Sequence, residues 1–156
     1  LNEKGYYVIS PFLALDLLKQ ESAYDSEMFV NAPLDAFRNV FDVDAVLFTT
    51  INKWEKKAAL SNIKVDIEYT LKSAKTGEVL FQRQGELNVN FSSGSGGLLG
   101  MALDMLQTAA TDHVVAARKC NYFILQDLPE GKYAPNFMQD GDTKADKQNV
   151  KTTVGG

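Results

Sequence analysis

The fold is indicated most clearly by one run of residues, Asp44-Ala45-Val46-Leu47-Phe48-Thr49-Thr50-Ile51-Asn52-Lys53-Trp54. Its apolar first half, Ala45 to Phe48, is typical of a central strand that is covered on both faces. The segment that follows alternates instead, because polar residues separate Ile63, Val65, Ile67, Tyr69 and Leu71. A period of two predicts a strand with one face in water. Together the two patterns predict an α+β fold.

The alternating segment continues into a predicted hairpin. Lys75-Thr76-Gly77 has the residues of a type I turn with Gly77 in the left-handed conformation, and residues 79–91 have the pattern of the returning strand. Arg83 and Gly85 interrupt the apolar side of that strand, where we expect a bend or bulge. The sequence therefore predicts a mainly antiparallel sheet with a long two-strand ribbon and with helices packed on one face.

Further elements are predicted on both sides of this ribbon. Proline starts and apolar spacings of three and four predict helices over about 11–21 and 33–42, and apolar spacing predicts a third helix over about 98–119. Short strands are predicted over about 6–9 and 121–125. Residues 1–128 are expected to form a single α+β domain. Residues 129–156, rich in Gly, Asp and Lys, are expected to be a poorly packed C-terminal tail.

Size and charge restrict the classes of function. The chain has 156 residues, 45% of them hydrophobic, which suffices for one domain with its own core. A net charge of −4 and a pI near 5.0 argue against a nucleic-acid partner. Cys120 and His113 are the only residues of their types, too few for a Cys/His zinc site or an internal disulfide. We therefore expect no metal and no cofactor, and interpret Cys120 as a small buried apolar residue at a helix end.

The candidate catalytic motifs are all incomplete. The link Ser92-Ser93-Gly94-Ser95-Gly96-Gly97 precedes a predicted helix but lacks the Gly-Lys-Ser/Thr of a P-loop, so we interpret it as a hinge. Asp112 and His113 are neighbours on a helix and point about 100° apart, so Asp112 cannot orient the imidazole. The other candidates have no catalytic motif around them: Asp25, Glu27, Glu55, Asp66, Ser95 and Thr108. We predict no catalytic residue and no enzyme activity.

Trp54, with Tyr6, Tyr7 and Tyr69, could supply an aromatic binding platform. Aromatic residues at strand ends more often belong to the rim of a core. We therefore interpret Trp54 as a packing residue at the end of its strand. The alternative is a ligand platform, which would make the protein a small-ligand or glycan-binding periplasmic module.

Four segments, taken in order, resemble a bacterial lipoprotein family of unknown function that was first noted among neisserial surface antigens. They are Gly5-Tyr6-Tyr7-Val8-Ile9-Ser10-Pro11, Ala32-Pro33-Leu34, Val43-Asp44-Ala45-Val46-Leu47-Phe48 with Ile51-Asn52-Lys53-Trp54, and Lys75-Thr76-Gly77-Glu78-Val79-Leu80-Phe81. The resemblance covers about residues 5–135, and Gly131-Lys132-Tyr133-Ala134-Pro135 is a looser match to the family's Gly-Pro-Tyr segment. Where the family has glycine, this chain has Phe41-Asp42.

The resemblance implies a fold similar to the amino-terminal domain of the Tol system propeller protein and to the periplasmic domain of the curli secretion channel. It implies no established enzymatic activity, and a lipid-modified Cys and a further strand ahead of the equivalent of Gly5. We therefore expect a non-enzymatic protein-interaction module on the periplasmic side of the outer membrane. It would be anchored there through lipid carried by the precursor, in an envelope or secretion-associated assembly.

The expected partners follow from the same resemblance. They are envelope lipoproteins of the same system. A sheet that lacks its preceding strand has an unpaired edge, which a second copy could occupy. We therefore also expect a homo-oligomer.

Overall fold

The computed structural model describes residues 1–20, 26–57, 62–90 and 111–154. The chain divides into two compact units. Unit 1 comprises Leu1–Phe48, Leu71–Phe81 and Asp127–Ala145. Unit 2 comprises Thr49–Thr70, Gln82–Gln126 and Asp146–Gly156.

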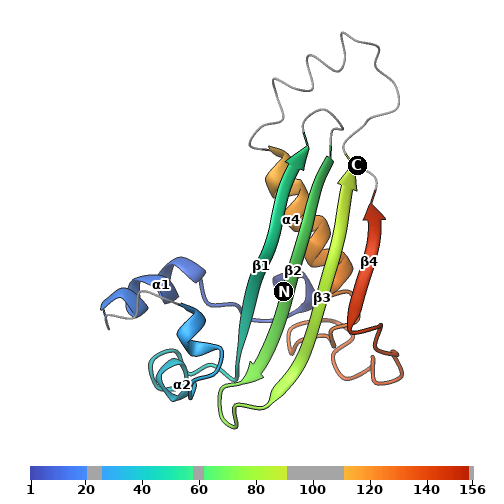
Figure 1. Ribbon diagram of the computed structural model, residues 1–156. Helices are drawn as coiled ribbons and strands as arrows, with labels where there is room; N and C mark the ends of the chain where they lie inside the picture. The colour runs from blue at the N-terminus through green and yellow to red at the C-terminus, as the bar shows by residue number, and fades with distance from the viewer. Residues whose placement is uncertain (21–25, 58–61, 91–110, 155–156) are drawn as a thin grey trace, which may run out of the picture. The chain divides into compact units, whose positions relative to one another are not determined.

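The described strands form one four-stranded sheet in the order β1-β2-β3-β4 (Figure 1). They are β1 (Ala45–Lys57), β2 (Asn62–Ser73), β3 (Val79–Asn90) and β4 (Asn149–Val154). The first three alternate in direction, whereas β4 runs parallel to β3, with Gln84 opposite Asn149 and Val89 opposite Val154. The predicted α+β class with a mainly antiparallel sheet is confirmed.

The turn between β2 and β3 forms as its residues predict. Gly77 has a φ of 73°, in the left-handed region that glycine adopts without steric cost. The Ser73 amide donates to the Glu78 carbonyl at 2.9 Å, and this bond closes the hairpin. The long two-strand ribbon is therefore present, with 12 residues in each strand.

The helices are α1 (Pro11–Gln20), α2 (Asp35–Phe41) and α4 (Thr111–Ile124), with short 3-10 helices η1 (Asn2–Lys4) and η2 (Ser26–Phe29). α1 begins at Pro11 as predicted, and the Ala14 amide donates to the Ser10 carbonyl. α2 is followed by Asp42, whose φ of 51° gives the helix a left-handed C-cap.

Both short predicted strands are wrong. Residues 6–9 form no strand, and residues 121–124 belong to α4, which continues beyond its predicted end at 119. The apolar residues of 121–125 that suggested a strand include Ile124, whose burial comes from helical spacing with Cys120. The first part of the predicted helix, residues 98–110, lies outside the described residues.

β1 lies at the edge of the described sheet, so its interpretation as a central strand is wrong. Its apolar start has another cause. Val46 and Phe48 pack, within unit 1, on a core whose buried members are Leu34, Phe37 and Ala74. The remaining partly buried apolar residues of that core are Leu18, Phe29, Phe41 and Val43. The apolar start of β1 is therefore explained by packing on this core, and not by strands paired with both of its edges.

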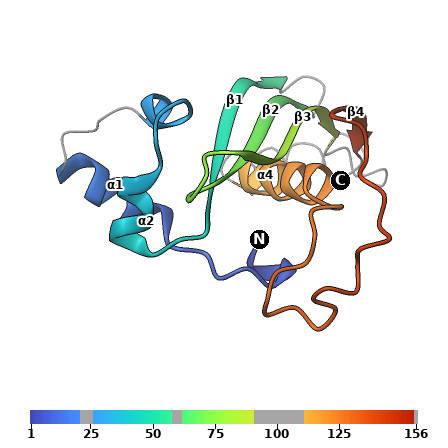
Figure 2. The same ribbon diagram turned by 90° about the horizontal axis from the view of Figure 1, so that it is seen from below.

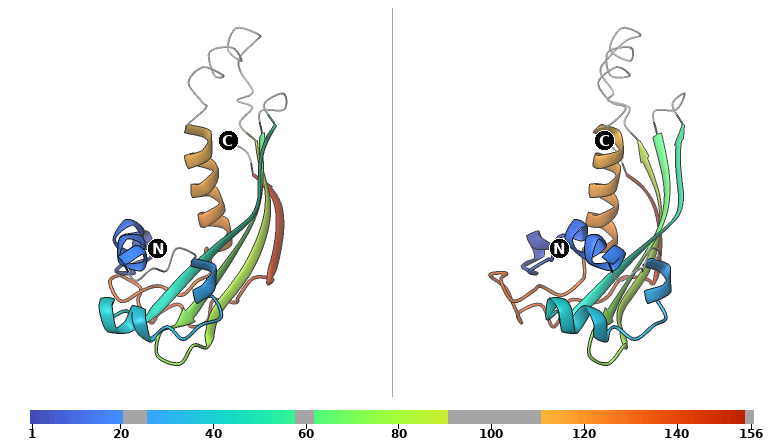
Figure 3. Two further views of the ribbon diagram at one scale, coloured as in Figure 1. Left: turned by 60° about the vertical axis from the view of Figure 1, so that its left-hand side comes forward. Right: turned by 90° about the vertical axis from the view of Figure 1, so that its left-hand side faces the viewer.

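Within unit 2, α4 covers one face of the sheet (Figures 2 and 3). Ala116, Cys120 and Ile124 recur every four residues and are fully buried. They face the alternating buried positions of the strands, which include Ile63, Val65, Ile67, Tyr69, Leu87 and Val89. Cys120 is thus a small buried residue as predicted, but it lies four residues before the end of α4.

The expected bend at Arg83 and Gly85 is wrong, because β3 is continuous through both residues. A Cβ atom at Gly85 would lie 2.4 Å from Cδ1 of Ile124, so glycine makes room for this side chain from α4. Arg83 is buried, and its guanidinium donates to the Ile124 carbonyl at 2.9 Å and to the Asp146 carbonyl at 3.2 Å. Its charge therefore lies at the C-terminus of α4, where the helix dipole favours a cation.

The expectation of a poorly packed tail is wrong for residues 149–154, which form β4. The composition of this segment gives no strand signal, because it has few apolar residues. It becomes a strand because its backbone pairs with β3. Both units also include residues beyond position 128. The boundary at 128/129 itself stays a prediction.

Candidate functional site

A hollow of about 510 Å³ lies in unit 2 between β1 and α4. The strands contribute Thr49, Ile51, Trp54, Ile67 and Tyr69, and α4 contributes His113, Val114, Ala117 and Asn121. The helical residues are spaced by three and four, so they share one side of α4 next to its buried stripe. The hollow therefore borders the core of unit 2 and is lined largely by apolar groups.

Trp54 reaches this hollow from β1, which also contributes Thr49 and Ile51. Between Ile51 and Trp54, the side-chain amide of Asn52 donates to Asp66 at 3.4 Å.

Trp54 and His113 form a pair at the edge of the hollow. The indole Nε1–H donates to His113 Nδ1 at 2.7 Å, and the two rings stack with centroids 5.9 Å apart and planes 28° from parallel. His113 accepts this bond only in its neutral form, with its proton on Nε2. The two residues lie 59 positions apart, so no sequence pattern could have paired them. Trp54 is partly buried near the end of β1, and its interpretation as a packing residue at the rim of a core stays a prediction.

Tyr69 and Asn121 form the second polar pair of the hollow. The Tyr69 hydroxyl donates to Oδ1 of Asn121. Burial, and secondarily the neighbouring Cys120, raises the pKa of Tyr69 well above its usual range. Burial also raises the pKa of the Cys120 thiol to about 11. Both groups stay protonated at neutral pH, so neither supplies a nucleophile or a base.

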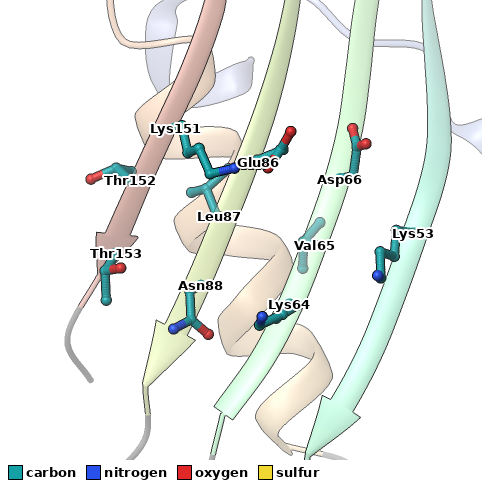
Figure 4. Close-up of a pocket in the computed structure, with 10 residues that line it drawn as sticks. All are labelled: Lys53, Lys64, Val65, Asp66, Glu86, Leu87, Asn88, Lys151, Thr152 and Thr153. Carbon is teal, nitrogen blue, oxygen red and sulfur yellow. Dashed lines mark ion pairs between the residues drawn. The ribbon is translucent and has the colours of Figure 1, made fainter.

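A second hollow, of about 710 Å³, lies on the sheet face away from α4 (Figure 4). Lys53, Lys64 and Lys151 surround it with Asp66 and Glu86. Lys151 pairs with Glu86 at 2.6 Å, and both side chains are more than half exposed. Exposed ion pairs of this kind contribute little to stability, and we interpret this surface as the wet face that the alternation of β2 predicts.

Glu55 and Asp66, one of the two carboxylate pairs considered from sequence, contact different groups in the structure. Glu55 lies 3.2 Å from the Lys53 ammonium, whereas Asp66 accepts hydrogen bonds from Asn52 and Gln84. Asp25, Thr108 and the link 92–97 lie outside the described residues. Among the residues that are described, no group of His, Cys, Asp or Glu side chains has the arrangement of a metal site.

The stacked pair predicts a fluorescence signal. Trp54 is the sole tryptophan and His113 the sole histidine, so the emission of the protein reports on this contact. His113→Ala removes both the acceptor of the indole N–H and the ring that stacks on Trp54, so the indole should become more exposed to water and its emission should move to longer wavelength. An unchanged emission spectrum would show that this contact does not set the environment of Trp54.

Comparison with known proteins agrees with the resemblance read from the four segments. A model of the family described as "Putative lipoprotein GNA1162-like" matches residues 1–123. The crystal structure of lipoprotein GNA1162 from Neisseria meningitidis is similar to this chain, with a TM-score of 0.50 and 19% sequence identity. The similarity covers 74% of this chain and 79% of that one, and at this identity it bears on the fold alone.

No curated protein matches the chain. Within residues 1–20, 26–57, 62–90 and 111–154, no helix has both the length and the apolar character needed to cross a membrane.

Proposed function

The chain belongs to the GNA1162-like lipoprotein family, and from this premise we propose that it is a non-enzymatic envelope protein whose folded part binds other proteins. Membership of a lipoprotein family implies attachment to a membrane through lipid. We place the protein on the periplasmic side of the outer membrane, in an assembly with envelope lipoproteins of the same system.

The observation that supports binding is the uneven distribution of exposed apolar side chains. Of the 15 large apolar residues exposed among the described residues, 12 belong to unit 1. Tyr7 is 79% exposed and Phe12 80% exposed. Large exposed apolar patches mark sites of contact with proteins or membranes, so the concentration of these residues in unit 1 supports binding.

Helix α1 contributes several of these residues. Leu18 packs on the core of unit 1, whereas Phe12, Leu13 and Leu15 are exposed. A helix of a soluble domain normally restricts its apolar residues to the stripe that faces the core. Apolar residues outside that stripe therefore indicate a second contact.

Charge favours a protein rather than a lipid surface as that contact. Unit 1 holds 7 of the 16 basic residues and 13 of the 20 acidic residues, a formal charge of −6. Membrane-surface helices carry Lys and Arg on their polar face, and anionic lipids repel an acidic surface. We therefore assign the apolar surface of unit 1 to protein contacts.

Photocrosslinking in cells tests this assignment. A photoreactive amino acid at position 12 should yield discrete protein adducts, because the native side chain is exposed and apolar. The same group at Lys64, on the wet face of the sheet in unit 2, is the matched control and should yield few. Adducts with lipid alone, or equal adducts from both positions, would contradict the proposal.

A further inference from the structure

We infer that α1 of one copy docks into the hollow between β1 and α4 of a second copy of this chain. The inference rests on the proposed function, since it names the partner that covers the apolar surface of unit 1. The proposed contact joins an exposed apolar helix to an apolar hollow, and every copy of the chain has both surfaces.

The chemistry of the two surfaces matches. α1 presents Phe12 and Leu13, which are 80% and 54% exposed, and the hollow is lined by Ile51, Trp54 and Val114. A volume of about 510 Å³ accommodates an aromatic and an aliphatic side chain together. An amphipathic helix that lays its apolar side into such a groove is a recurring mode of recognition.

The charges of the two units are also complementary. Unit 1 has a formal charge of −6, whereas unit 2 holds nine basic and seven acidic residues and has a charge of +2. Asp16 is exposed on α1, one turn from Phe12, and Arg118 is exposed on α4 directly after Ala117, which lines the hollow. Opposite charges around an apolar contact promote association and fix its orientation.

The same charges disfavour the simpler symmetric dimer. A contact in which unit 1 meets unit 1 would bring two acidic surfaces together. When α1 of one copy docks into the hollow of another, the hollow of the first copy and α1 of the second remain free to bind further copies. Such head-to-tail contacts form a ring if they close and a filament if they do not.

Two variants with opposite defects test the inference. Phe12→Gln with Leu13→Gln removes the apolar side of α1, and Val114→Glu places in the hollow an anion that the acidic unit 1 repels. Met138→Gln, on an 82% exposed residue of unit 1, and Tyr122→Glu, on a 70% exposed residue of α4 outside the hollow, are the matched controls. All five substitutions in these four variants are at exposed positions, and circular dichroism with thermal melting checks that each variant folds.

Sedimentation velocity over a wide concentration range is the measurement. The unmodified chain and both controls should self-associate, less strongly at high salt, and each blocked variant should do so at least about tenfold more weakly. An equimolar mixture of the two blocked variants should form dimers and nothing larger, because only one intact pair of surfaces remains.

Three results would overturn the inference. They are a monomeric unmodified chain, a mixture of blocked variants that does not dimerise, and a Val114→Glu variant that associates normally. If any of them occurs while position 12 still crosslinks to another protein in cells, the proposed function stands and only the choice of partner fails. Absence of both self-association and adducts would remove both proposals.

Discussion

Replacing Gly5 by alanine is expected to lower the free energy of unfolding by about 2–5 kcal/mol. Gly5 has a φ of 75°, and a Cβ atom on it would lie 2.2 Å from the Ala134 backbone nitrogen and 2.6 Å from the Ala134 Cβ. The backbone cannot retreat easily, because the Tyr133 amide donates to the Gly5 carbonyl at 3.0 Å and the Gly131 amide donates to the Lys4 carbonyl at 2.7 Å. Chemical denaturation measures the loss.

Two other glycines provide controls for this experiment. Gly77 also has a positive φ but has open space around its missing Cβ, so Gly77→Ala should show only the cost of the left-handed backbone, about 1–2 kcal/mol. Gly141 has open space and no positive φ, so Gly141→Ala should be nearly neutral. If Gly5→Ala costs no more than Gly77→Ala, close packing against Ala134 is not what requires glycine at position 5.

Replacing Arg83 by alanine is expected to cost about 3–5 kcal/mol of unfolding free energy. The residue is 3% exposed and donates to two carbonyl groups, one of which is the last carbonyl of α4. Its removal leaves a cavity and buried acceptors that have lost their charged donor. Arg83→Lys should recover only part of the loss, because an ammonium cannot reproduce the planar fork of the guanidinium.

The control for Arg83 is its neighbour Gln82, which is exposed and bonds Glu68 on the wet side of the sheet. Gln82→Ala should change the free energy of unfolding by no more than about 0.5 kcal/mol. Urea denaturation of the three variants gives the comparison. Equal stability of Arg83→Ala and the unmodified chain would mean that the C-terminus of α4 does not depend on this side chain.

Much of the local structure could be predicted from short-range patterns. The strict alternation from Ile63 to Tyr69 predicts which face of β2 is buried, Gly77 marks the hairpin turn, and Ser10-Pro11 marks the start of α1. Each pattern depends on steric and hydrophobic preferences within a few residues. For the same reason the class of fold and a set of family segments could be recognised without coordinates.

The candidate site could not be predicted, because it joins distant segments. The pattern around Trp54 places it in a strand, and the pattern around His113 places it beside Asp112 on a helix, but neither pattern relates the two residues to each other. Their contact depends on α4 packing over β1. The sequence predicts a break at Gly85 for a similar reason, since the side chain that requires glycine there, Ile124, comes from α4.

By itself the amino-acid sequence determined the α+β class, the buried face of β2 and the turn that joins β2 to β3. Only the tertiary structure decided that β1 lies at the edge of the described sheet, that residues 149–154 pair with β3, and that Arg83 meets the end of α4. The physical reason is range. Periodicity records which side of an element avoids water, whereas the choice of neighbour depends on contacts that close long loops and are selected by the packing of the whole chain.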